Sequence, residues 1–468
     1  MPRTGEPRKL GEPEETDETH ELVSPTAKPI YKEEPQRWVM LILYCIILSV
    51  SYGGLGPIGV SVDSSQTYYD LDNFTFNFVY LCAFADFAIS MMLWSWILDA
   101  YGLRIVVLVS CSVMVGGYVM QLFYKTEFWL VVFGGALVDT ARAMIWSTST
   151  TFIARWFSSS SKSLAYGIIF AVAASFSVGL FLSVRLVISS PADFEDEFIW
   201  FVVALLILSA STLLVAVFVF HERPDHPPGP QTIGKNSETK ERPCGWMCTP
   251  CRASNRSTTS MYLAVYLASV MGTWSAASLL LQIMDDHDYT HGQITTVGII
   301  YAIFSLPTPL ITGFLMDTTR DYRSVVIGMI GAATIGFSMF YWTIDRGWPF
   351  YMAIAVMSLS TGSYSISFAV CTTELAYPLP EKNVSMFMFF WAQFAGAAGT
   401  VLASFASVVT TALLAFLVIY FGCTLVLVTN RFTPVTYGRL QAAERESRQL
   451  DQRYNYVETT TTTKLEHS

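Results

Sequence analysis

The sequence predicts an all-α membrane protein with twelve transmembrane helices in two six-helix halves and both termini in the cytoplasm. Hydrophobic residues make up 52% of its 468 residues, which is more apolar surface than a soluble chain of this length can bury. The chain contains twelve apolar runs of about 20 residues, enough to cross a hydrocarbon core of ~30 Å at ~1.5 Å per helical residue. In addition, one short charged loop occurs twice, half a chain apart.

The apolar runs form two sets of six. They lie near residues 38–62, 76–98, 104–124, 127–154, 163–186, 198–220, 260–284, 294–316, 324–344, 349–372, 384–405 and 408–430. The predicted domains follow from these runs: a disordered acidic N-terminal tail (1–37), the N-terminal half (38–220), a cytoplasmic linker rich in Pro, Gly, Lys and Arg (221–259), the C-terminal half (260–430) and a polar C-terminal tail (431–468).

The repeated loop begins at Asp99 in the first half and at Asp317 in the second. Both copies follow an apolar run and open the next one. Two copies at equivalent positions indicate two homologous halves, a construction found in many secondary transporters. Their charges can cap helix ends and bridge the halves, so the loops are predicted to form an inner gate. The residues assigned to it are Asp99, Gly102, Arg104, Asp317, Arg320 and Arg323.

Basic residues set the orientation, because loops on the cytoplasmic side carry an excess of Lys and Arg. One set of loops holds Arg104, Arg155, Lys162, the basic linker and Lys382, whereas the opposite set has chiefly Lys125 and Arg346. Both tails lie on the basic side. They are therefore predicted to be cytoplasmic.

A solute site is expected near mid-membrane, and two aromatics occupy equivalent depths there. Tyr52 lies 14 residues into the first span and Trp274 lies 14 residues into the seventh. Gly53 and Gly54 follow Tyr52 and loosen a helix that lines a cavity. Two opposed rings make a cation–π cage for an ammonium group, and Gln393 in span 11 can hydrogen-bond a polar substituent. The alternative is that both aromatics serve packing or face lipid.

Charges inside spans are costly and therefore informative. Asp139 and Arg142 stand three residues apart on one helix face, which favours a structural or gating pair over a substrate site. Asp86 has no partner near it in the sequence and is the candidate for proton or cation coupling. Glu374, at the inner end of span 10, is expected to pair with an arginine of a loop.

The sequence contains little that indicates a metal site or an enzyme active site. Cys244, Cys248 and Cys251 cluster in the linker, but their spacing matches no standard zinc site, which leaves S-acylation or inert thiols. We expect no metal and no cofactor. No nucleophile–base set or phosphate loop accompanies the spans, so the chain is not expected to be an enzyme.

The loop Asp99-x-x-Gly102-x-Arg104 resembles the signature of the major facilitator superfamily. Ser95 stands where that signature has glycine, whereas the second copy keeps Gly313. Within the superfamily, several stretches resemble the feline leukaemia virus subgroup C receptor-related family, which includes a lysosomal branch. They are 96–104, 155–157, 222–228, 278–282, 317–323 and 374–378, with 56–58 closer to the lysosomal branch.

The resemblance implies transport of small organic solutes: choline and ethanolamine for some members, haem in an older assignment, and pyridoxine-like vitamins for the lysosomal branch. In choline-carrying members a span-1 and a span-7 aromatic cage the ammonium, and these fall on Tyr52 and Trp274; a span-11 glutamine falls on Gln393. The chain departs from the family at Ala173 or Ala174, where a glutamine is expected. It departs again at Val370, where an acid is expected.

The leading hypothesis is alternating-access transport of a choline- or ethanolamine-like amine by a monomer, in the plasma membrane or a lysosome-like organelle. Haem transport is the alternative, although all six histidines lie outside the predicted spans. A pyridoxine-like vitamin is a further candidate. A membrane receptor that binds without transporting is the least favoured hypothesis.

Overall fold

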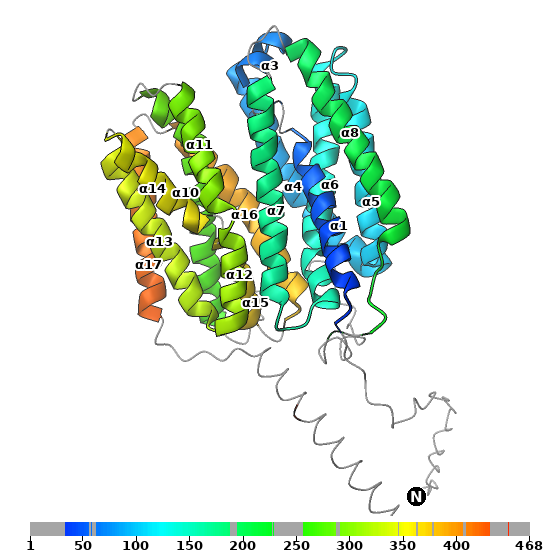
Figure 1. The fold of residues 1–468 in the computed structure, drawn as a ribbon. Coiled ribbons are helices and arrows are strands. Elements are labelled where there is room, and N and C mark those ends of the chain that lie inside the picture. The colour runs from blue at the N-terminus through cyan, green and yellow to red at the C-terminus, as the bar shows by residue number, and fades with distance from the viewer. Residues whose placement is uncertain are drawn as a thin grey trace, which may run out of the picture.

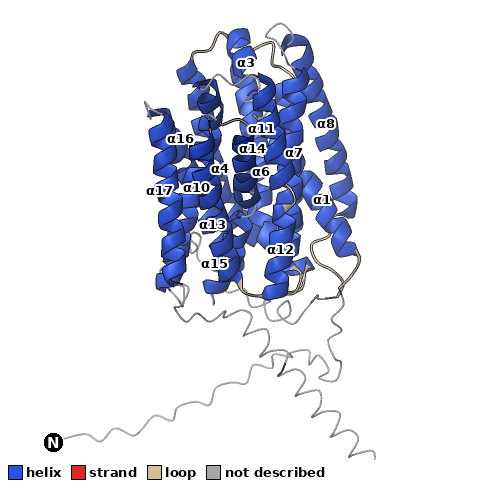
Figure 2. Ribbon diagram, turned by 60° about the vertical axis from the view of Figure 1, so that its left-hand side comes forward, coloured by secondary structure: helices blue, strands red, loops and turns tan. Residues whose placement is uncertain are grey.

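The computed structural model describes residues 33–55, 58, 62–187, 194–226, 228, 256–286, 291–344, 346–361, 364–376, 379–405, 409–430 and 448. All regular structure in these residues is helical (Figure 2). Most of the two predicted tails and of the linker, with its cysteines Cys244, Cys248 and Cys251, lies outside the described residues.

The helices of the first half are α1 (Gln36–Val50), the 3₁₀ turn η1 (Ser51–Gly53), α3 (Val62–Tyr69), α4 (Asn73–Tyr101), α5 (Leu103–Gln121), α6 (Phe128–Trp156), α7 (Lys162–Val187) and α8 (Phe194–Val219). Those of the second half are α10 (Arg256–Asp286), α11 (His291–Ser305), α12 (Thr308–Thr319), α13 (Tyr322–Thr343), α14 (Trp348–Thr361), α15 (Tyr364–Leu375), α16 (Glu381–Phe405) and α17 (Val409–Thr429).

Within the described residues, eight helical stretches are long and apolar enough to cross a membrane. The chain is therefore a multi-pass membrane protein, and the count of twelve spans stays a prediction. One expected span, 294–316, is divided into α11 and α12, with Pro307 as the N-cap of α12. Proline has no amide hydrogen to continue the helical ladder, which explains the break.

The first span is also broken, earlier than the apolar run suggests. Helix α1 ends at Val50, and Tyr52 lies in the 3₁₀ turn that follows. Helix α5 bonds two carbonyls at this break: the Tyr118 hydroxyl donates to Val50 O at 2.6 Å, and Gln121 Nε2 donates to Gly54 O at 2.7 Å. A Cβ on Gly53 would lie 2.5 Å from the Tyr118 hydroxyl. The turn that carries Tyr52 is thus fixed by α5.

The two halves meet mainly along two helix pairs, α7 with α12 and α4 with α16, with smaller contacts of α6 with α16 and of α7 with α15. Figure 1 shows α7 and α16 between the helices of the first half and those of the second. Glycines allow the α7–α12 approach: a Cβ on Gly167 would lie 2.5 Å from Pro309 O, and one on Gly313 would overlap the carbonyl of Ser163. Small residues serve this purpose in membrane helix packing.

Candidate binding site and inner gate

The guanidinium of Arg142 lies between two aromatic rings at the centre of the first half. Its Cζ is 5.2 Å from the ring centroid of Tyr52 and 5.4 Å from that of Phe87, within the ~6 Å reach of a cation–π contact. Arg142 stands midway along α6, and Phe87 stands at the middle of α4. The predicted aromatic site at Tyr52 therefore already holds a cation, supplied by the protein itself.

Two carboxylates accompany this cation. Asp139 Oδ1 is 3.1 Å from Arg142 Nη2, with the Asp139 side chain 4% exposed and that of Arg142 22% exposed. The pairing expected from the i, i+3 spacing is formed. On α4, the carboxylate of Asp86 accepts the single hydrogen of the Thr140 hydroxyl, which lies 3.2 Å from both of its oxygens, and a second hydrogen bond of 3.4 Å from Ser90. Asp86 is thus held by hydroxyls at the same depth as the ion pair.

A second aromatic group joins the halves next to this site. The Trp146 ring of α6 lies 4.8 Å from Phe170 on α7 and 5.4 Å from Phe389 on α16. Trp146 is buried. The three rings connect the first half to α16 of the second half, one turn beyond Arg142.

The structure describes the two candidate binding residues of the second half, Trp274 and Gln393, less completely. Trp274 belongs to α10, but its side chain lies outside the described residues. Five residues before it, α10 is bonded to α17, because the Tyr420 hydroxyl donates to Ser269 O at 2.9 Å. Gln393 is a half-buried residue of α16. The opposition of Tyr52 and Trp274 across one cavity therefore stays a prediction.

The two motif aspartates form contacts between the halves. Asp317, at the end of α12, accepts hydrogen bonds from the backbone amides of Ser163 (3.1 Å) and Leu164 (2.8 Å) in the first turn of α7. Asp99, at the end of α4, is ion-paired with Lys382 in the first turn of α16. A third contact joins the two helix starts directly, Lys162 Nζ to Glu381 Oε1 at 3.0 Å. These three contacts, called the gate below, lie at one end of the bundle.

The motif arginines contact their own halves. Arg104 donates to Val217 O, in the last turn of α8, at 3.0 Å. Arg323 donates to the carbonyl of Asn430, just after α17, and to the hydroxyl of Tyr262 at 3.1 Å. Each arginine therefore neutralises the negative C-terminal end of the last helix in its half. The predicted bridging role falls to the aspartates, and the arginines hold the loops in place.

The remaining gate candidates have local roles. Gly102 ends α4 with φ +83°, and Arg320 ends α12 with φ +54°. Both are helix caps in the left-handed region, where glycine is the unstrained residue. A Cβ on Gly102 would also lie 2.9 Å from Glu222, whose carboxylate is 2.7 Å from Arg155. Glu374 lies at the end of α15, close enough to act electrostatically on Tyr322 of α13.

Comparison with known proteins identifies the family. A sequence model described as the Major Facilitator Superfamily matches residues 38–404. The chain belongs to this superfamily.

Curated relatives within the superfamily agree with the resemblance seen in the sequence. The zebrafish choline/ethanolamine transporter flvcr2a is 23% identical over 398 residues, which is 82% of either chain. The human choline/ethanolamine transporter FLVCR2 is 21% identical over 75% of this chain and 68% of its own. The crystal structure of the E. coli transporter FucP has a TM-score of 0.66 at 10% identity, covering 85% of this chain and all of that one, and it supports the fold. Family and fold are those of transporters.

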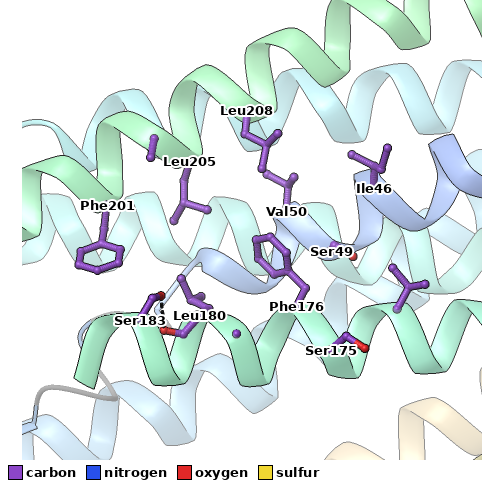
Figure 3. A pocket seen from close by; sticks show the side chains of 13 residues that line it. Ile46, Ser49, Val50, Ser175, Phe176, Leu180, Ser183, Phe201, Leu205 and Leu208 are labelled. Carbon is purple, nitrogen blue, oxygen red and sulfur yellow. Dashed lines mark hydrogen bonds between the residues drawn. The ribbon is translucent and has the colours of Figure 1, made fainter. Parts of the chain in front are cut away.

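The structure also holds a cavity whose lining contains no charged side chain. It has a volume of about 740 Å³ and is lined by α1, α7 and α8 (Figure 3). Most of its lining side chains are apolar, Ile46, Phe176, Phe201 and Leu208 among them, and the polar ones are three serines. Such a lining suits hydrocarbon and provides no counter-charge for an ionic solute.

Within the described residues, the structure holds no group of three His, Cys, Asp or Glu side chains placed to bind a metal ion. The sequence reasoning missed Phe87, one of 32 phenylalanines. Its position in the sequence could have identified it, because Phe87 follows Asp86 at the middle of its span, at the same depth in the membrane as Arg142.

Proposed function

We propose that this superfamily member carries a small amine, of the choline or ethanolamine type, across a membrane by alternating access. The observation that carries the proposal is the cation held between Tyr52 and Phe87. A ring face that binds guanidinium presents the quadrupole that an ammonium group requires, with a stabilisation of ~2 kcal/mol or more when water is excluded. The names of the zebrafish and human relatives point to the same class of substrate.

Charge favours a cation over a neutral solute. Asp86, Asp139 and Arg142 together carry one net negative charge when the carboxylates are ionised. An uncompensated charge in the membrane interior is costly, and a bound ammonium group would compensate it. Gln393 and Trp274 complete the proposed site from the second half.

The gate supplies the conformational element of this proposal. Its three contacts join the halves at the end predicted to be cytoplasmic, so the site is reached from the other side in this state. Breaking them would let the halves rock about the site, as expected for repeat-built transporters. We place the protein, as a monomer, in the plasma membrane or a lysosome-like membrane.

The test is uptake of labelled choline, ethanolamine, pyridoxine and haem into proteoliposomes, in the parent and in Tyr52→Ala and Trp274→Ala. Trp342→Ala is the matched control, because this aromatic is 67% exposed on α13. We expect amine uptake by the parent and the control and its loss in both site variants. Uptake of haem or pyridoxine alone would overturn the amine assignment. Normal amine uptake by both site variants would place the substrate elsewhere.

A further inference from the structure

Resting on the proposed function, we infer that Arg142 is a resident cation that the substrate must displace from Tyr52, and that it thereby sets the affinity and selectivity of the site. Its guanidinium lies on the ring that the ammonium needs, at 5.2 Å from the centroid. One ring face accommodates one cation closely, and two cations in contact repel. Substrate and Arg142 therefore compete for the same surface.

The surroundings of Arg142 hold it in place without enclosing it. Asp139 pairs with one end at 3.1 Å, and Phe87 covers it from α4 at 5.4 Å. Arg142 is nevertheless the more accessible member of its ion pair: its side chain is 22% exposed, whereas that of Asp139 is 4% exposed. The arginine is thus the partner with more open space beside it.

Competition of this kind has a selective consequence. Guanidinium is weakly hydrated and stacks on aromatic faces, so it resists displacement by a strongly hydrated cation. A quaternary ammonium, which likewise loses little hydration, competes best. The resident arginine would therefore admit methylated amines and reject small, strongly hydrated ions such as Na⁺.

The charge-neutral double variant Asp139→Asn/Arg142→Gln tests the inference. It removes one positive and one negative charge, so the local net charge is unchanged and a gain in affinity reports the vacated ring. The probe is tetramethylammonium, measured by equilibrium binding to purified protein. We expect the double variant to bind about tenfold tighter than the parent. Adding Tyr52→Ala should abolish that gain.

Two further variants guard against trivial explanations. Arg155→Gln/Glu222→Gln neutralises a different arginine–carboxylate pair, 2.7 Å apart and near the end of α6 rather than at Arg142, and should leave the affinity unchanged. Arg142→Lys keeps the charge but stacks less well, so it should give an intermediate gain. If the double variant does not give monodisperse protein, the affinity of Arg142→Lys tests the inference in its place.

The outcomes separate this inference from the proposed function. Equal affinity of parent and double variant, or binding by neither, overturns the resident-cation inference, whether or not choline is transported. If the parent carries no choline but the double variant gains Tyr52-dependent binding, the inference stands and the proposed substrate falls. A gain that survives Tyr52→Ala also overturns the inference, because the vacated ring would not be its cause.

Discussion

The carboxylate of Asp317 accepts a hydrogen bond from the backbone amide of Leu164 at 2.8 Å, across the boundary between the halves. Its other oxygen accepts from Ser163 at 3.1 Å. Amides in the first turn of a helix have no intrahelical partner, and a negative charge there is favourable. A side chain of one half thus caps a helix of the other, and the proposed gate opening would remove this cap.

Asp317→Ala should therefore open the gate. Loss of a helix cap costs about 0.5–2 kcal/mol, and here that cost falls on the closed state alone, so the open population should rise by roughly two- to thirtyfold. Spin-label distances between α7 and α12 at the gate end measure this shift. Asp321→Ala is the matched control, because Asp321 caps α13 within its own half through Ser324. An equal shift in both variants would refute the cross-half assignment.

The α4–α16 side of the gate should be the weaker one. Ser95 stands four residues before Asp99, where Gly313 stands before Asp317, and Lys382 fills the gap by bonding both Ser95 O and Asp99. Asp99 is 60% exposed, and ion pairs in such surroundings contribute about 0–1 kcal/mol. Lys382→Ala should thus shift the α4–α16 distance less than Asp317→Ala shifts the α7–α12 distance. A larger shift would reverse this ranking.

The Lys162–Glu381 ion pair should tolerate an exchange of its two charges between the halves. Both side chains are less than a fifth exposed, so removing one leaves the other partly buried and unpaired, at a cost of about 1–3 kcal/mol. Lys162→Ala and Glu381→Ala should each reduce uptake severalfold. The exchange Lys162→Glu/Glu381→Lys should restore much of it. If the exchange is as poor as either single variant, the contact does not act through its charges.

The two helix caps of the motif should respond in opposite ways to substitution. Gly102→Ala places a Cβ at φ +83° and 2.9 Å from Glu222, and should lower the free energy of unfolding by about 1–2 kcal/mol. Arg320→Gly relieves a left-handed arginine and should be neutral or slightly stabilising. Thermal unfolding in detergent measures both. A destabilised Arg320→Gly would show that the contacts of this arginine outweigh its backbone strain.

The architecture followed from features that act locally. Apolar runs, breaker residues and the duplicated loop predicted helices that the structure contains, and the i, i+3 spacing predicted the Asp139–Arg142 pair. Contacts between distant elements could not be predicted in the same way. Nothing near Tyr52 in the chain identifies Phe87, and nothing near Asp317 identifies the amides of α7, because both depend on how helices pack. The loop arginines Arg104 and Arg323 are an example. Their charge and position suggested that they bridge the two halves, whereas in the structure each contacts the end of the last helix of its own half.

Binding of an amine on the face of Tyr52 can be tested by the uptake of labelled choline into proteoliposomes that hold Tyr52→Phe or Tyr52→Leu. Phenylalanine keeps the ring quadrupole, whereas leucine keeps only the apolar bulk. We expect Tyr52→Phe to retain most of the uptake and Tyr52→Leu to lose at least about tenfold, which corresponds to ~1.4 kcal/mol or more. Uptake by Tyr52→Leu equal to that of the parent would contradict binding on this ring.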